Sequence, residues 1–145
     1  LTRPHSLICK SFTMISFETK IRVEYHHTDQ MGIVHHSNYV KFFEVARTEW
    51  LRAMGITYAE MERRGVMMPI VDVAVKYRNP ALYDELISVT AFVDEAPMAR
   101  MTFRYEVRGE DGREIATGST TLGFIDSQTR RPQRAPQWLL EVIKF

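Results

Sequence analysis

The chain has 145 residues, of which 45% are hydrophobic and 26% are charged, and its net charge is +1. A chain of this length can bury a hydrophobic core within a single domain without disulfide support. The small net charge gives no basis for nucleic-acid binding, and no apolar run approaches the roughly 20 residues that span a bilayer. The single cysteine, Cys9, excludes an internal disulfide and fits a reducing cytoplasm.

The first 13 residues differ in character from those that follow. They show no hydrophobic period and do not begin with methionine, whereas Met14 directly precedes strand-like residues. We therefore expect residues 1–13 to be an N-terminal extension or a remnant of expression, and residues 14–145 to form a single domain. A transit peptide is the alternative, because the segment has basic and hydroxyl residues without acids, although it is short for one.

Hydrophobic periodicity predicts a strand and two helices in the first half of the chain. Alternating residues 21–25 predict a half-buried strand. Apolar residues recur at helical spacing over residues 39–54, which predicts a helix of about four turns that ends at Gly55. A capping-box sequence opens residues 57–64 and predicts a second, shorter helix.

The second half of the chain has a period of two, which is typical of β-strands. Strands are predicted at residues 71–78, 86–93, 99–108 and 114–125. Asp111-Gly112 predicts a hairpin turn between the last two. We expect an α+β fold in which the long helix packs on one face of an antiparallel meander.

One face of the last predicted strand carries small residues, namely Ala116, Gly118 and Thr120. Small residues in a strand let another element approach closely. We expect the large side chains of the long helix, Phe42, Phe43 and Trp50, to press against this face.

The segment between the first predicted strand and the long helix concentrates reactive side chains. It contains four of the five histidines and one acid, Asp29, which is followed by a glycine turn at Gly32. A carboxylate beside a helix N-terminus suits acyl transfer, because the acid can activate water or attack a carbonyl while backbone N–H groups hold the oxyanion. The long helix has no acid in its first turn, so its positive end is available, although Ser37 or Asn38 could cap it.

The same residues have two simpler interpretations. An aspartate before a glycine turn can serve only as an Asx-turn or a cap. Clustered histidine and aspartate can bind zinc, but His26 and His27 would point apart on a strand and no HxxxH spacing occurs. We therefore expect no metal site, and we expect one histidine to orient a group or to shuttle a proton.

Three arginines follow the last predicted strand, namely Arg130, Arg131 and Arg134. Arginine forks match phosphate oxygens, so the run is a candidate phosphate clamp, and the alternative is a solvated loop. The chain has no glycine-rich phosphate loop, so side chains would have to hold any phosphate. The run is short and lacks interleaved aromatics, which argues against nucleic acid.

The segment that contains Asp29 resembles a known family. The relevant run is Tyr25-x-x-Thr-Asp29-x-x-Gly32-Ile-Val-His-His36-Ser-Asn38-Tyr39, and an aromatic helix is predicted after it. Both resemble the hotdog-fold acyl-CoA thioesterases, and among these most closely the 4-hydroxybenzoyl-CoA thioesterase family and its Tol–Pal-associated branch. The resemblance extends over about residues 18–142. It implies a five-stranded antiparallel sheet wrapped around a long helix, and a homodimer, often paired into a homotetramer, with sites at the subunit interface.

The resemblance also implies roles for individual residues. The catalytic carboxylate falls on Asp29, and the oxyanion donor falls on or near the backbone N–H of His36. Tyr25 and His36 correspond to assisting residues of the Tol–Pal-associated branch, and Asn38 and Tyr39 are candidate substrate-binding residues. Basic side chains usually meet the coenzyme A phosphates in this family, and the candidates here are Arg130, Arg131 and Arg134.

The function implied by the resemblance is that of a cytoplasmic acyl-CoA thioesterase acting on a short-chain or aromatic acyl group, without a cofactor other than the CoA of the substrate. Water or Asp29 itself attacks the thioester carbonyl. Many relatives have a second acid two residues before the catalytic one, where this chain has His27. The alternatives are an acyl-acyl carrier protein thioesterase and a non-catalytic acyl-CoA-binding hotdog protein.

Overall fold

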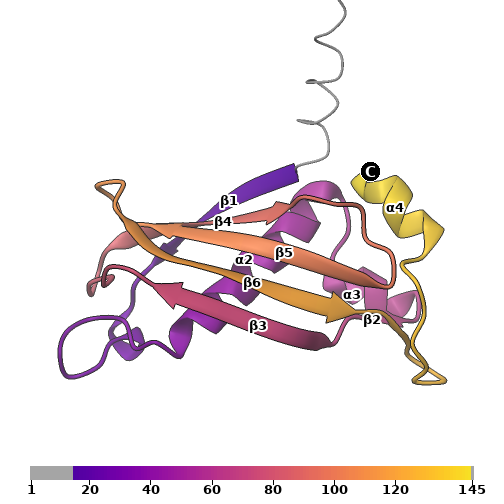
Figure 1. Ribbon diagram of the computed structural model, residues 1–145, viewed down its shortest axis with the longest axis horizontal. Helices are drawn as coiled ribbons and strands as arrows, with labels where there is room; N and C mark the ends of the chain where they lie inside the picture. Colours follow the sequence, from indigo (N-terminus) through magenta and orange to yellow (C-terminus); the bar gives the residue numbers. More distant parts are fainter. Residues whose placement is uncertain (1–14, 145) are drawn as a thin grey trace, which may run out of the picture.

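The computed structural model describes residues 15–144. The expected extension at residues 1–13, with Cys9, and the expected start at Met14 lie outside this range. The elements run, in chain order, β1 (Ile15–Arg22), η1 (Tyr25–His27), α2 (Asn38–Met54), α3 (Tyr58–Arg63), β2 (Val66–Met67), β3 (Ile70–Tyr77), β4 (Leu86–Val93), β5 (Arg100–Arg108), β6 (Glu114–Gly123), β7 (Ile125–Asp126) and α4 (Gln137–Ile143) (Figure 1).

Five strands form one antiparallel sheet in the order β1-β4-β5-β6-β3, so β1 and β3 are its edges. The strands β4, β5 and β6 are successive neighbours, as predicted. The prediction of a four-strand meander is wrong for β3, which pairs with β6 rather than with β4. The connection over residues 78–85 is too long for a tight hairpin, and it carries the chain from one edge of the sheet toward the other. A separate small sheet joins β2 to β7.

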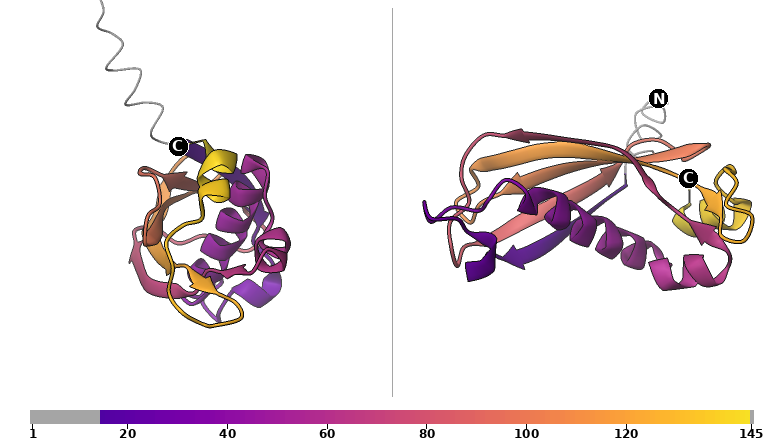
Figure 2. Two further views of the ribbon diagram at one scale, coloured as in Figure 1. Left: turned by 90° about the vertical axis from the view of Figure 1, so that its right-hand side faces the viewer. Right: turned by 90° about the horizontal axis from the view of Figure 1, so that it is seen from below.

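The helix α2 covers one face of the sheet, as Figure 2 shows. It ends at Gly55, whose φ of 106° is left-handed and whose N–H donates to the carbonyls of Leu51 and Arg52. The Oγ1 of Thr57 accepts the N–H of Glu60 at 3.1 Å and so begins α3. Both predicted helices are confirmed. Their boundaries were predictable because they depend on local capping chemistry.

The first predicted strand differs from the observed one. Its strand part, β1, begins earlier and ends at Arg22, and residues 25–27 form the 3-10 helix η1 instead. The chain leaves the sheet after Val23, whose N–H donates to the carbonyl of Glu85 at 2.8 Å. The turn then closes where the Glu24 N–H donates to Nδ1 of His27 at 2.8 Å. The alternation of apolar residues at 21, 23 and 25 therefore continues beyond the end of the strand at Arg22.

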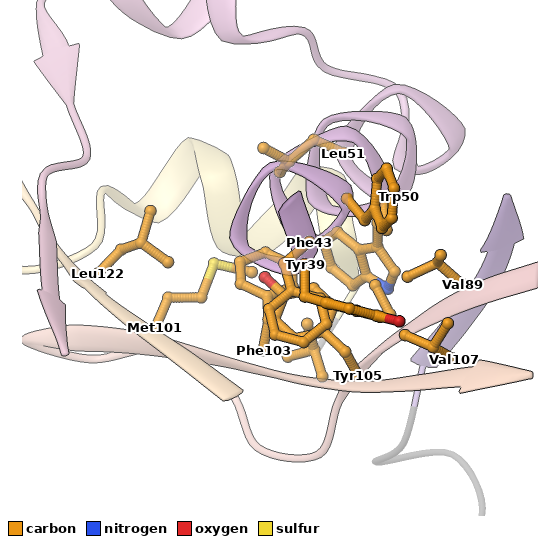
Figure 3. Packing of buried hydrophobic residues seen from close by; sticks show 14 of the residues in the cluster. Tyr39, Phe43, Trp50, Leu51, Val89, Met101, Phe103, Tyr105, Val107 and Leu122 are labelled. Carbon is orange, nitrogen blue, oxygen red and sulfur yellow. The ribbon is translucent and has the colours of Figure 1, made fainter. Parts of the chain in front are cut away.

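Aromatic side chains from α2 fill the space between helix and sheet (Figure 3). Phe43 stacks on Tyr105 with ring centroids 4.2 Å apart, and Trp50 meets Phe103 edge-on at 5.3 Å. The C-terminal helix α4, which the sequence analysis did not predict, adds Leu139 and Ile143 to the same core. Within residues 15–144, no helix has both the length and the apolar character that a membrane span needs.

Gly118 lies directly under the ring of Phe43, as expected from the small residues of this strand. A Cβ at Gly118 would lie 2.5 and 2.6 Å from ring atoms of Phe43 and 2.6 Å from the carbonyl oxygen of Ala74. We expect Gly118→Ala to lower the free energy of unfolding by about 1–3 kcal/mol, because an overpacked core must shift. Gly123→Ala in the same strand is the control, since its Cβ would meet nothing closer than 3.7 Å. Equal urea midpoints for the two variants would contradict this packing.

Candidate active site

A compact loop carries Asp29 between η1 and α2. The Asp29 N–H donates to the carbonyl of Ile33 at 3.0 Å, and the Gly32 N–H donates back to the carbonyl of Asp29 at 3.0 Å. Gly32 has a φ of 78°, which favours glycine. The N–H of Val34 donates to the carbonyl of Ala81 at 2.9 Å and so fixes the loop to the connection between β3 and β4.

Asp29 is half-buried, and one of its carboxylate oxygens makes no hydrogen bond to the described residues. Its Oδ1 accepts the N–H of Met31 at 2.8 Å, so the Asx-turn that the sequence allowed does form. Its Oδ2 makes no hydrogen bond within residues 15–144. The turn fixes the side chain and leaves the second oxygen for chemistry, so the two interpretations of Asp29 are compatible.

A cavity of about 340 Å³ opens beside Asp29. The loop, the start of α2 and the end of β3 contribute its walls, with apolar and aromatic side chains that include Met31, Ile33, Val34, Tyr39 and Tyr77. Its remaining wall comes from residues 78–80. The cavity lining is therefore more apolar than polar, and its polar residues besides the two tyrosines are Asp29, His36, Arg78 and Asn79.

The start of α2 presents a free backbone donor at the position expected for an oxyanion site. The N–H groups of Asn38 and Tyr39 donate to the carbonyls of His35 and His36, at 3.0 and 3.4 Å. The Ser37 N–H donates to Nδ1 of His35 at 3.3 Å, and the Ser37 side chain does not cap the helix. The N–H of His36 makes no hydrogen bond to any residue from 15 to 144. The positive end of the helix is thus open at His36.

The structure brings Asp29, His36 and Tyr39 to one cavity. The carbonyl of His36 accepts a hydrogen bond from the Tyr77 hydroxyl at 3.1 Å, and its ring lies 6.4 Å from that of Tyr77. Tyr39 is only 3% exposed, and burial raises its pKa to about 12. Tyr39 therefore stays protonated at neutral pH.

Asn38 does not line the cavity. It is 7% exposed, and its Nδ2 donates to the carbonyl of His27 at 2.8 Å. The amide thus ties the start of α2 to η1. The position indicates that Asn38 holds the loop in place, whereas Tyr39 can touch a ligand directly.

Tyr25 lies on the other side of Asp29 from His36. Its side chain is 80% exposed and meets Tyr83 edge-on with centroids 5.7 Å apart. These two tyrosines line a second hollow, of about 720 Å³, that Asp29 also borders. Asp29 thus separates two hollows, and Tyr25 and His36 do not share one. The sequence analysis missed Tyr83, which no local motif identifies.

The three candidate arginines lie at the other end of the molecule. Arg130, Arg131 and Arg134 follow β7, and Figure 1 shows this loop and the loop before α2 at opposite ends of the sheet. The 17 residues of α2 separate the two ends by about 26 Å, at about 1.5 Å per residue. All three side chains are exposed and make no ion pair within residues 15–144. One chain alone therefore cannot bring them to Asp29.

Two of the histidines near Asp29, His26 and His27, form a cluster with Glu24. Ligand atoms of Glu24, His26 and His27 lie within 4.8 Å of one another, so the argument that a strand separates the two rings is wrong. However, Nε2 of His26 already bonds Glu24 at 2.7 Å, and Nδ1 of His27 accepts the Glu24 N–H. Burial, and then His26, lower the pKa of His27. These bonds account for the cluster as a brace of η1, and the absence of a metal site stays a prediction.

Comparison of the sequence and the fold with known proteins identifies a family. Residues 23–143 match the model of the thioesterase-like superfamily. The chain belongs to this superfamily. Acyl-CoA thioesterase YbgC of Haemophilus influenzae is 35% identical over 122 residues, which cover 83% of this chain and 89% of that protein. The DHNA-CoA thioesterase of Staphylococcus aureus superposes with a TM-score of 0.82 at 34% identity, and the match covers 89% of each chain.

Membership of the thioesterase-like superfamily confirms two predictions. The α+β hotdog architecture is confirmed, and so is the class of enzyme, a thioester hydrolase. A DHNA-CoA thioesterase of Synechocystis has the same fold at 20% identity, with a TM-score of 0.81 over 90% of this chain and 96% of that one. The Tol–Pal-associated branch and the roles of individual residues stay predictions.

The cavity wall formed by residues 78–80 is not predicted from the sequence. Arg78 and Asn79 donate their backbone N–H groups to the carbonyl of Ile115 at 2.8 and 3.1 Å, and Nδ2 of Asn79 donates to the carbonyl of Glu114 at 2.8 Å. The available signal was Asn79-Pro80, which marks the end of a strand. Nothing local shows that a strand ending there would face Asp29.

Proposed function

We propose that the protein is an acyl-CoA thioesterase that hydrolyses a short-chain or aromatic acyl-CoA to the free acid and CoA. The supporting observation is that one Asp29 oxygen and the His36 N–H, both without a hydrogen bond to any other described residue, belong to residues that line one mainly apolar cavity. The names of the relatives in Haemophilus influenzae and Staphylococcus aureus point to CoA thioesters as substrates.

In the proposed reaction, Asp29 takes a proton from water and the resulting hydroxide attacks the thioester carbonyl. The His36 N–H and the positive end of α2 stabilise the negative oxygen. The C–S bond then breaks, and the CoA thiolate takes the proton that Asp29 accepted from water. In the alternative route Asp29 attacks the carbonyl directly, and the C–S bond breaks with release of the CoA thiolate. Water then hydrolyses the mixed anhydride to the free acid and Asp29, and the proton set free passes to the thiolate. His36 would orient or polarise the reacting groups from the Asp29 cavity, and Tyr25 would do so from the second hollow, which Asp29 also borders.

A thiolate leaves readily, so one acid and one oxyanion site supply the proposed chemistry without a metal or other cofactor. The cavity volume of about 340 Å³ is near the lower end of the range for small-molecule sites, about 300–1,000 Å³. The part of the site that one chain forms therefore has room for a short aliphatic or single-ring acyl group, and a second copy would add to its walls.

We further propose that two copies pair through β3. Among residues 15–144 this edge strand pairs only with β6, and four of its large apolar side chains are between 38% and 52% exposed, namely Ile70, Val71, Val73 and Tyr77. An apolar strand with an open edge is a template for another strand. A homodimer, with or without further pairing into a homotetramer, would cover it.

Antiparallel pairing of two β3 strands would bring the arginines to the active site. The Ile70 end of β3 adjoins a hollow of about 500 Å³ that Arg134 borders, and the Tyr77 end borders the Asp29 cavity. A two-fold axis would place the first end of one copy beside the second end of the other. Arg130, Arg131 and Arg134 of one copy could then hold the CoA phosphates of a substrate whose thioester lies at Asp29 of the other.

The arginine loop has its own test. Alanine at Arg130, Arg131 and Arg134 should raise KM about tenfold or more for a CoA ester, because charge-assisted bonds to phosphate are lost, and should change KM little for an N-acetylcysteamine ester without phosphates. A control variant removes the same charge from three other exposed arginines, namely Arg52, Arg63 and Arg108. Equal effects on both esters would contradict a phosphate clamp.

A hydrolysis screen tests the proposed function. Purified protein is offered aliphatic acyl-CoA esters of increasing length, benzoyl- and phenylacetyl-CoA, and the same acyl groups on acyl carrier protein. We expect turnover of short or aromatic CoA esters. Faster turnover of the carrier-protein esters would indicate that acyl carrier protein, and not CoA, carries the natural acyl group. Tight binding without any turnover would indicate a binding protein. We place the enzyme in the cytoplasm, where both donors are made.

A further inference from the structure

The connection between β3 and β4, residues 78–85, is the wall segment of the active site. Its residues 78–80 line the Asp29 cavity. Its Ala81 is completely buried, and its carbonyl accepts the N–H of Val34 at 2.9 Å. Leu82 forms a bridge with Ile33. The wall segment therefore sets where the Asp29 loop lies relative to the opposite side of the cavity.

Glu85 and Arg113 hold this wall segment with a two-pronged ion pair. Nη1 of Arg113 donates to Oε2 of Glu85 at 2.8 Å, and Nη2 donates to Oε1 at 2.8 Å. Nη2 also donates to the carbonyl of Pro80 at 2.8 Å. Glu85 in turn accepts the N–H groups of Leu82 at 3.1 Å and Glu110 at 3.2 Å. The pair thus joins both ends of the wall segment to the hairpin between β5 and β6.

Backbone geometry explains why side chains, and not a ladder of backbone hydrogen bonds, hold the wall segment. Pro80 has no N–H to donate, and Asp84 has a left-handed φ of 70°, so the wall segment cannot continue the sheet. Bidentate arginine–carboxylate bonds fix direction as well as distance. The Glu85 side chain is only 10% exposed, so loss of Arg113 would leave a poorly hydrated charge.

We propose that Glu85 and Arg113 are positioning residues for thioester hydrolysis. Neither side chain lines the Asp29 cavity. They act through Pro80, Ala81 and Leu82, which fix the cavity wall and the Asp29 loop at one separation. This inference rests on the proposed function, because it assigns the pair to the placement of the acyl group against Asp29.

The charge state of the pair is consistent with this role at neutral pH. Hydrogen bonds from Arg113 hold the pKa of Glu85 below its ordinary value of 4.5. A lowered folded pKa means that the stabilisation is fully present above the ordinary value. It is lost as the pH falls through the lowered one.

The test compares Glu85→Gln, Arg113→Gln and the double variant with Asp94→Asn. Asp94 forms the matched control pair, because it accepts from Nε and Nη2 of Arg104 at 3.1 and 3.3 Å beyond the opposite end of β4. We expect each variant of the Glu85–Arg113 pair to lower kcat about tenfold or more with a smaller change in KM, since small misplacements cost rate. The double variant should be no slower than the worse single one. Asp94→Asn should keep kcat within about twofold, as surface pairs contribute little.

Hydrogen–deuterium exchange supplies a readout that does not need activity. Peptides that cover residues 29–36 and 78–85 should exchange faster in the Glu85 and Arg113 variants than in wild type, and unchanged in Asp94→Asn. Unaltered exchange and kcat in the pair variants would overturn the inference, as would an equal loss in the control. If wild type hydrolyses no acyl-CoA, the proposed function fails, and the exchange rates still decide whether the pair holds the loop.

Discussion

Replacement of Asp29 by asparagine is expected to lower kcat for the preferred acyl-CoA by at least ~100-fold, the scale for loss of a positioned acid or base. An asparagine Oδ1 can still accept the Met31 N–H that the aspartate accepts at 2.8 Å, so the Asx-turn should persist. The variant loses only the charge and the basic oxygen. Steady-state kinetics give kcat, and the thermal midpoint and far-UV spectrum report whether the fold is intact.

Asp126 offers a matched control for this change. Its Oδ1 accepts the N–H groups of Gln128 and Thr129 at 2.9 and 3.0 Å, which is the same kind of turn at the other end of the molecule. Asp126→Asn should keep normal kcat, and any effect should fall on KM, because Asp126 also holds the loop of Arg130 and Arg131 through its backbone. A nearly normal kcat for Asp29→Asn would remove Asp29 from the mechanism, whatever the control does.

The second large effect is expected at the β3 edge. Lysine at both Val71 and Val73, which are 48% and 38% exposed, should convert a dimer to a monomer, because charges on an edge strand oppose strand pairing. Activity should fall together with the dimer, by about tenfold or more, if charge-assisted contacts from the partner hold the substrate. Light scattering after size exclusion measures the mass, and the same fractions are assayed.

The control for the edge uses two exposed valines on α2. Val40 and Val45 are 42% and 43% exposed, so lysine there adds the same charge to a similar apolar surface. That variant should remain a dimer with full activity. A wild-type protein that is monomeric and fully active would contradict the proposed pairing, and so would a lysine edge variant that stays dimeric.

Local chemistry made most of the fold predictable. The helical stripe and the left-handed Gly55 define α2, and Thr57 defines the start of α3. In β4 and β5 every second residue is buried, so the period of two is clear. Gly118 under Phe43 was predictable because a strand needs small residues where a large ring approaches.

Features that depend on distant contacts were not predictable. The strand β3 is exposed on both faces, so its sequence does not show that it pairs with β6 at the edge. The alternation that ends at Tyr25 gave no sign of the turn closed by His27. The resemblance makes Arg130, Arg131 and Arg134 candidates for the CoA phosphates, but the sequence does not show that their loop and the Asp29 loop lie at opposite ends of the sheet. For the same reason the wall segment and its Glu85–Arg113 pair were missed.

We propose that the thioester lies between the Asp29 carboxylate and the N–H of His36. A crystal structure with a non-hydrolysable CoA analogue, in which a methylene group separates the carbonyl from sulfur, tests it most directly. We expect the carbonyl oxygen to accept the His36 N–H at about 3 Å, Asp29 Oδ2 to face the carbonyl carbon or a water beside it, and the acyl group to fill the apolar cavity. A carbonyl bound elsewhere, with the Asp29 carboxylate turned away from it, would contradict this placement of the thioester.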